Sequence, residues 1–197
     1  MKRWLVLVGV LGCGPSTPAT TSSGGSAASH WQPIGESNHV YKDEAGAFTI
    51  KFPVAFTLDV KRDVVGSSEL VTTTAAATTH DERVNYIAVK TVIDPAVQYD
   101  CEKGIASTRD KTLQAFSCKV TSEKPLTHPT TKWPGHEVMF ECNKTSLTGM
   151  LQVYCDASTV PTDKKAVMYE VFAASSRVVW SEPDARSFLA SFAPAAK

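Results

Sequence analysis

Cysteine and histidine are among the residue types that can serve as nucleophiles, metal ligands or redox groups, and the 197-residue sequence contains five of each. No two cysteines form a C-x-x-C pair, the spacing typical of redox motifs and zinc knuckles. His136-Glu137 begins like the H-E-x-x-H zinc motif, but Phe140 stands where the second histidine would be. The sequence therefore predicts no metal site and no cofactor.

Motifs for other kinds of catalysis are also missing from the sequence. It contains neither a G-x-S-x-G nucleophile turn nor a Gly-rich phosphate loop. The aspartates and glutamates offer no pair at a spacing that suggests acid–base work. We therefore predict a protein that is not an enzyme and has no catalytic residues. One alternative stays open: a small-ligand carrier, or an enzyme whose site is assembled from distant residues.

The N-terminus has the layout of a secretory signal. Lys2 and Arg3 form a short basic region, and the run from Trp4 to Gly12 is uncharged and mostly apolar. These nine residues are too few for a membrane span, which needs about 20. The run ends in Val10-Leu11-Gly12-Cys13, which resembles the lipobox of bacterial lipoproteins.

That resemblance implies a processing event and a location. In the lipoprotein family a peptidase cuts before the cysteine, and acyl chains such as palmitate are attached there, so Cys13 would be the lipidation site. Several buried acyl chains hold a protein stably in a membrane. The residue after the cysteine is Gly14; in enteric lipoproteins an aspartate there retains the protein at the inner membrane. We therefore expect a bacterial cell-envelope protein, with the outer membrane favoured over the inner.

The segment after Cys13 predicts a tether. Residues 14 to 29 are only Ser, Thr, Gly, Pro and Ala, and such a composition cannot bury enough apolar surface to offset the entropy of ordering. The predicted organisation is a signal peptide at 1–12, the lipidated cysteine with a flexible tether at 13–40, and a globular domain at 41–197. Without Lys2 and Arg3, 18 basic and 20 acidic side chains remain, a net charge of about −2. Nucleic acid is therefore not an expected partner.

The remaining four cysteines predict two disulfides, because an even number in an exported chain is typical of disulfide pairing. The preferred pairing is between neighbours in the sequence, Cys101 with Cys118 and Cys142 with Cys155. The alternative, Cys118 with Cys142 and Cys101 with Cys155, stays open.

Hydrophobic periodicity predicts an α+β domain. Alternating apolar residues such as Phe48, Ile50 and Phe52 indicate strands, while Ser181 and Pro183 are typical of a helix start. Strands followed by a helix, further strands and a last helix favour a single antiparallel β-sheet with helices packed on it. The expected strands are 47–52, 55–60, 69–79, 83–92, 117–124, 135–142, 150–155 and 166–174, and the expected helices are 100–116 and 182–192.

This order of elements resembles the PsbP/Mog1-like α/β/α sandwich domain over about residues 47 to 193. The resemblance is carried by the strand exit Phe48-Thr49-Ile50-Lys51-Phe52-Pro53 and the terminal segment Ser187-Phe188-Leu189-Ala190-Ser191-Phe192. It implies a protein-binding scaffold without catalysis.

One loop is a candidate recognition surface. Trp133-Pro134-Gly135-His136 places an aromatic and an imidazole side chain close together, although a tryptophan that covers the sheet edge beside a Pro-Gly turn explains the same residues. The sequence as a whole predicts a non-catalytic cell-envelope lipoprotein that binds a protein or a surface. Its expected partners are the membrane, through the lipid, and another envelope protein.

Overall fold

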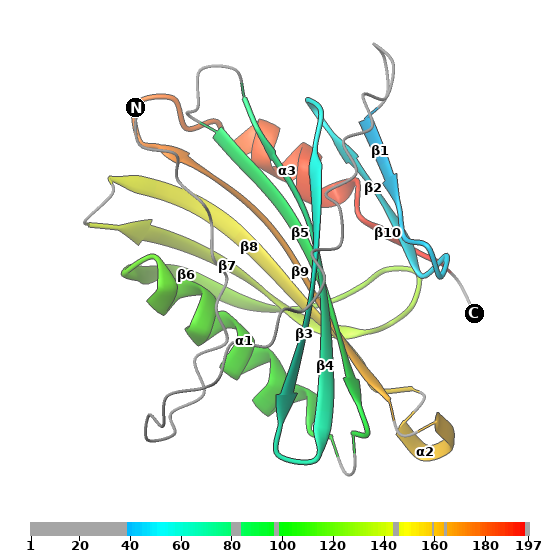
Figure 1. The fold of residues 1–197 in the computed structure, drawn as a ribbon. Helices are drawn as coiled ribbons and strands as arrows, with labels where there is room; N and C mark the ends of the chain where they lie inside the picture. Colours follow the sequence, from blue (N-terminus) through cyan, green and yellow to red (C-terminus); the bar gives the residue numbers. More distant parts are fainter. Residues whose placement is uncertain are drawn as a thin grey trace, which may run out of the picture.

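The computed structural model describes residues 39–79, 84–96, 99–143, 146–158, 160–163 and 165–195. Its largest element is a seven-stranded sheet in which every neighbouring pair is antiparallel (Figure 1). The strand order is β3-β4-β5-β9-β8-β7-β6. The strands are β3 Thr57–Val65, β4 Ser68–Thr78, β5 Val84–Asp94, β6 Cys118–Thr127, β7 Pro134–Cys142, β8 Leu147–Asp156 and β9 Ala166–Ser176.

A second, three-stranded sheet is built from the two ends of the described chain. Its central strand β2 (Phe48–Phe52) pairs antiparallel with β1 (His39–Lys42) on one side and with β10 (Ala193–Pro194) on the other. The Ser191 hydroxyl accepts a hydrogen bond from the Lys51 amide at 3.1 Å. The small sheet therefore closes the fold by joining residues far apart in the sequence.

Two helices of more than one turn have clear start signals. In α1 (Cys101–Ala115) the Asp100 side chain accepts a hydrogen bond from the Lys103 amide, and in α3 (Glu182–Ala190) the Ser181 hydroxyl accepts one from the Asp184 amide. Both contacts satisfy amides that have no partner inside the helix. The short helix α2 covers Val160–Asp163. Among the described residues, no helix combines the length and the apolar character needed to cross a bilayer.

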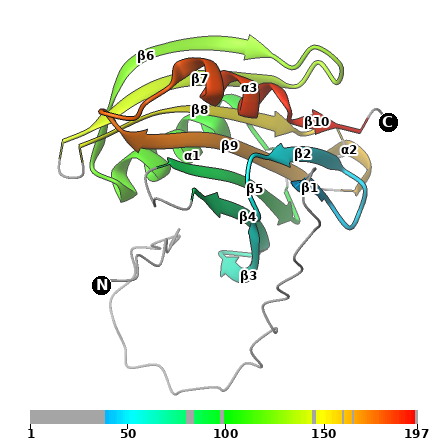
Figure 2. The ribbon, with the colours of Figure 1, turned by 90° about the horizontal axis from the view of Figure 1, so that it is seen from above.

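The elements form layers on the two faces of the seven-stranded sheet. Figure 2 shows α3 and the small sheet on one face and α1 behind the other. Alternation along β9 serves both layers: Tyr169 and Val171 belong to the core under the small sheet, and Met168 and Phe172 belong to the core under α1. The Asp43 carboxylate, next to β1, ties the small sheet to the large one through bonds of 2.8 and 2.9 Å from the Lys90 ammonium.

The expected single sheet with packed helices is wrong. Strands account for 57% of the structure and helices for 18%, and the strands form two sheets. Phe48, Ile50 and Phe52 do alternate inward as expected, and all three are buried. Their strand, however, has its hydrogen-bonding edges occupied by β1 and β10, so it lies across the large sheet as part of a separate layer.

Candidate functional site

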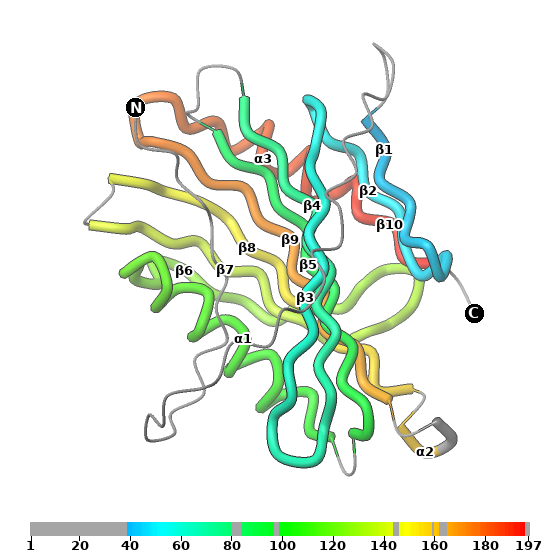
Figure 3. Tube along the Cα trace, viewed as in Figure 1, coloured from blue at the N-terminus to red at the C-terminus, as the bar shows by residue number. Residues whose placement is uncertain are grey.

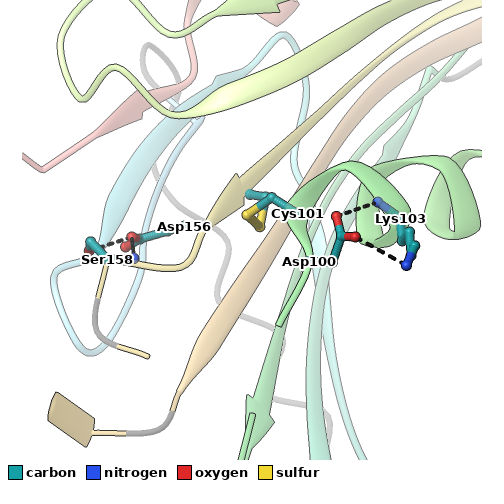
Figure 4. Close-up of a disulfide and its surroundings, with 6 residues drawn as sticks. Asp100, Cys101, Lys103, Asp156 and Ser158 are labelled. Atoms are coloured by element: carbon teal, nitrogen blue, oxygen red, sulfur yellow. Dashed lines mark hydrogen bonds and ion pairs between the residues drawn. A yellow bond between two sulfur atoms is a disulfide. The ribbon is translucent and has the colours of Figure 1, made fainter. Parts of the chain in front are cut away.

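Two disulfides fasten α1 and the β6–β7 pair. One joins Cys101, the first residue of α1, to Cys155 near the end of β8, and the other joins Cys118 to Cys142 (Figure 4 shows the Cys101 bond beside Asp100 and Lys103). The preferred sequence-local pairing is therefore wrong, and the alternative pairing is the one formed. Register explains the result, because Cys118 lies directly opposite Cys142 in the antiparallel β6–β7 pair.

The structure separates the two residues of the candidate recognition surface. Trp133 is only 8% exposed and stacks on Tyr169, with ring centroids 4.9 Å apart and planes 7° from parallel. His136 lies on β7 in the same alternation as Val138, which packs under α1. The two side chains therefore belong to opposite faces of the sheet and line no common surface, and Trp133 is a core residue.

The loop that carries Trp133 is ordered by a buried histidine. The His128 amide donates to the Trp133 carbonyl at 2.9 Å, and the His128 Nδ1 atom accepts from the amides of Thr130 and Thr131. Burial lowers the pKa of His128, which favours the neutral ring that such acceptance requires. The role of this segment is therefore to fix the tryptophan against the aromatic core.

His136 takes part in a charged cluster between α1 and β6. Its Nδ1 atom lies 2.5 Å from Glu123 Oε1, and the Arg109 guanidinium donates to both Glu123 oxygens at 2.6 and 2.8 Å. Burial alone would raise the pKa of Glu123, but the hydrogen bonds from His136 and Arg109 hold that pKa below its usual value. Each acceptor in the cluster already has a donor, so the arrangement binds α1 to β6.

A second polar cluster attaches α3 to the opposite face. The buried Glu137 carboxylate accepts hydrogen bonds from Gln152 at 2.8 Å and from Arg186 at 3.2 Å, and Lys124 lies 3.0 Å away. Burial raises its pKa, and these three partners together reverse the effect, so the pKa of Glu137 lies below its usual value. The Glu137 carboxylate therefore attaches α3 to the sheet, and its partners leave it unavailable as an acid for catalysis.

Glu170 is a carboxyl buried between the sheet and α1. Its side chain points under α1, where the Thr112 hydroxyl donates to Oε2 at 2.6 Å. Burial raises the pKa of Glu170 to about 7. The carboxyl is sealed between helix and sheet with no access for a substrate, so its consequence is for stability and not for chemistry.

Neither a metal site nor a large cavity stands out among the described residues. No group of three or more His, Cys, Asp and Glu side chains there is placed to hold a metal ion. A hollow of about 30 Å³, the volume of one or two waters, lies between Tyr86, Trp180 and Asp184. Ser181 and Asp184 at its rim belong to the start of α3, where the Ser181 hydroxyl is already used as a cap.

The outer edge of β3, residues 57 to 65, is the candidate binding surface, and we call it the β3 edge. Strand β3 ends the seven-stranded sheet (Figure 3). Half of its backbone donors and acceptors therefore face away from β4. Three of its valines are exposed, Val60 by 50%, Val64 by 75% and Val65 by 50%. Its register with β4 is unbroken through all nine residues. An extended strand with apolar side chains is a template on which another strand can add.

The opposite edge of the sheet, strand β6, is protected against pairing with another strand, unlike the β3 edge. Strand β6 contains Pro125, which has no backbone donor, and its register with β7 shifts between Val120 and Ser122. Prolines and bulges are the usual means by which proteins block edge pairing. Strand β3 contains neither a proline nor a register shift, and within the strand itself only the charged side chains of Asp59, Lys61, Arg62 and Asp63 oppose edge pairing.

Sequence reasoning missed this surface because it ended the strand at Val60. The charged segment Lys61-Arg62-Asp63 interrupts the apolar alternation, and this reads as a loop when β3 is expected to be half buried. The signal that could have found it is Val64-Val65-Gly66-Ser67, two β-branched residues before a glycine. Gly66 has a φ of +63° and opens the two-residue turn between β3 and β4.

The predicted lipidation site, Cys13, lies outside the described residues. Comparisons of the chain with protein-family models, with curated proteins and with solved structures find no match. The likenesses to bacterial lipoproteins and to PsbP/Mog1-like domains therefore stay predictions from the sequence.

Proposed function

We propose that this protein is a non-catalytic binding module, anchored by a lipid on Cys13 in a bacterial cell envelope, which holds another polypeptide at the β3 edge. The observation that carries the proposal is the exposed strand itself, with Val64 three-quarters accessible beside a row of backbone groups that no other described strand pairs. A polypeptide strand is the ligand that such an edge fits, because it can satisfy those groups in register.

Three further observations support a binding role. The described polar clusters around Glu123 and Glu137 are internally paired and attach helices to the sheet. Two disulfides, Cys101–Cys155 and Cys118–Cys142, fit an oxidising compartment outside the cytosol. The N-terminal Val10-Leu11-Gly12-Cys13 segment fits a lipoprotein anchor.

The proposal can be tested in the cells that make the protein. A photo-crosslinking amino acid is placed at Val64 and, as a matched control, at Val178, which is 93% exposed but lies outside the strands. We expect a discrete protein adduct from position 64 and none from position 178. The intact mass of the same purified chain should show acyl groups on a chain that begins at Cys13, and these should be lost in Cys13→Ala.

Each part of the result bears on a different claim. An unacylated chain would overturn the anchor, and the absence of an adduct at position 64 would overturn the β3 edge as the binding surface. Equal adducts from both positions would show that contact is non-specific and would also contradict the proposal.

A further inference from the structure

We infer that the polypeptide bound at the β3 edge is a second copy of this chain, whose own β3 pairs antiparallel with the first about a two-fold axis through Val60. This inference rests on the proposed function, since it names the partner for the same surface. A symmetric pair would join two seven-stranded sheets into one continuous sheet and would pair seven of the nine residues of each exposed edge.

Charge selects the register. In an antiparallel pair, directly opposite residues have their side chains on the same face of the sheet. For two identical strands this holds only when the two-fold axis lies between the two copies of one residue, which then faces itself. We name each register by that residue. Five such registers, centred on residues 59 to 63, pair at least five residues of β3. Axes through Asp59, Lys61, Arg62 or Asp63 each bring that charged residue against its own copy. Like charges directly opposite destabilise a pair.

The fifth register, centred on Val60, is free of this penalty. It places Val60 against Val60 of the second copy, and it places Asp59 against Lys61 of the second copy twice, once on each side of the axis. Seven residues, 57 to 63, are then paired with no like charges opposite one another. The half-exposed Val60 side chain becomes the apolar centre of the pair.

The symmetry also agrees with an anchor on each copy. A two-fold axis that pairs identical strands antiparallel stands normal to the sheet, so corresponding faces of the two sheets point the same way. The small sheet covers one of those faces, as Figure 2 shows. Both copies of β1, and so both His39 residues where the described chain begins, lie on the same side of the combined sheet. Two tethers can then reach one membrane.

Sedimentation equilibrium of the full chain, purified from its membrane in a density-matched detergent, tests the inference. We expect a monomer–dimer equilibrium for the natural sequence. Asp59→Lys and Lys61→Asp each create like-charge contacts and should raise the dimer dissociation constant about tenfold. The double variant Asp59→Lys/Lys61→Asp restores opposite charges across the axis and should return the constant close to the natural value. Val178→Lys, at an exposed site outside the strands, should change nothing.

The charge exchange keeps the inference falsifiable even where a single variant folds poorly, because the double variant carries the same two residue types. A monomer at every concentration would overturn self-pairing. A dimer that the single exchanges leave intact, or that the double exchange fails to restore, would overturn the Val60 register. An acylated monomer that crosslinks through position 64 to a different protein would overturn self-pairing and leave the binding module standing, whereas an unacylated dimer would overturn the anchor alone.

Discussion

The buried carboxyl of Glu170 predicts an unusual pH dependence of stability. In the folded protein burial raises its pKa to about 7, while in the unfolded chain the pKa returns to its ordinary value of 4.5. Between these pH values the folded state holds a proton that the unfolded state has lost. Stability from this group is therefore fully present below about pH 4.5 and declines as the pH rises toward 7, where the folded carboxyl also ionises.

The size of the effect follows from the difference between the two pKa values. A difference between a pKa of about 7 and one of 4.5 corresponds to roughly 3 kcal/mol of unfolding free energy. Glu170→Gln keeps the shape and an acceptor oxygen for the Thr112 hydroxyl but cannot ionise. The free energy of unfolding of this variant should therefore equal that of the natural protein near pH 4.5 and should be about 3 kcal/mol higher at pH 8.

Urea unfolding followed by circular dichroism at pH 4.5, 6, 7 and 8 measures this difference. Glu141→Gln is the matched control, because Glu141 is 45% exposed in its ion pair with Arg177 and such surface pairs contribute little. Parallel stability curves for the natural protein and Glu170→Gln across this range would refute the reasoning. A slope that disappeared equally in Glu141→Gln would assign the pH dependence to general charge effects.

Three further changes have expected outcomes. Trp133→Ala empties a buried site stacked on Tyr169 and should cost about 3–5 kcal/mol in urea unfolding; a loss below 1 kcal/mol would mean that the loop carries no core residue. Gly149→Ala places a Cβ 2.6 Å from the Ala173 carbonyl oxygen, so the melting temperature should fall by an amount equivalent to about 1–3 kcal/mol; an unchanged melting temperature would contradict the close approach of β8 and β9. Removing the disulfide with the longer loop, Cys101–Cys155, by double alanine substitution should cost about 4 kcal/mol, against about 3.5 for Cys118–Cys142, and a reversed order would contradict loop length as the cause.

Local patterns were enough to predict most of the individual elements. The apolar face shared by Ile105, Leu113 and Phe116 indicates a helix at 100–116, and α1 covers Cys101–Ala115. Alternation around Phe140 and Val153 indicated two strands that the structure contains as β7 and β8. Such signals depend only on residues that are close in the sequence, so these helices and strands could be predicted without knowledge of the fold.

The arrangement of those elements could not be predicted, because it depends on contacts between distant residues. Nothing near Phe48 shows that its strand pairs with Ala193 and not with β3. The prediction of the disulfide pairing was wrong for the same reason. Cys101 lies beside Cys155 only because α1 crosses the end of β8. The place of Trp133 in the core also depends on a distant residue, because its ring stacks on Tyr169, which comes 36 positions later in the sequence.

The small sheet has a consequence for the order in which this chain can fold as it is synthesised. Its central strand β2 is made early, but its partner β10 comprises residues 193 and 194, about 145 positions later. Phe188 and Phe192, which complete the aromatic core beside Phe48 and Phe52, also come from that late segment. Contacts of such long range form slowly, since the loop between them must close first. The domain therefore cannot finish its core until its last residues have been synthesised, and the earlier strands must wait for them with that part of the core open.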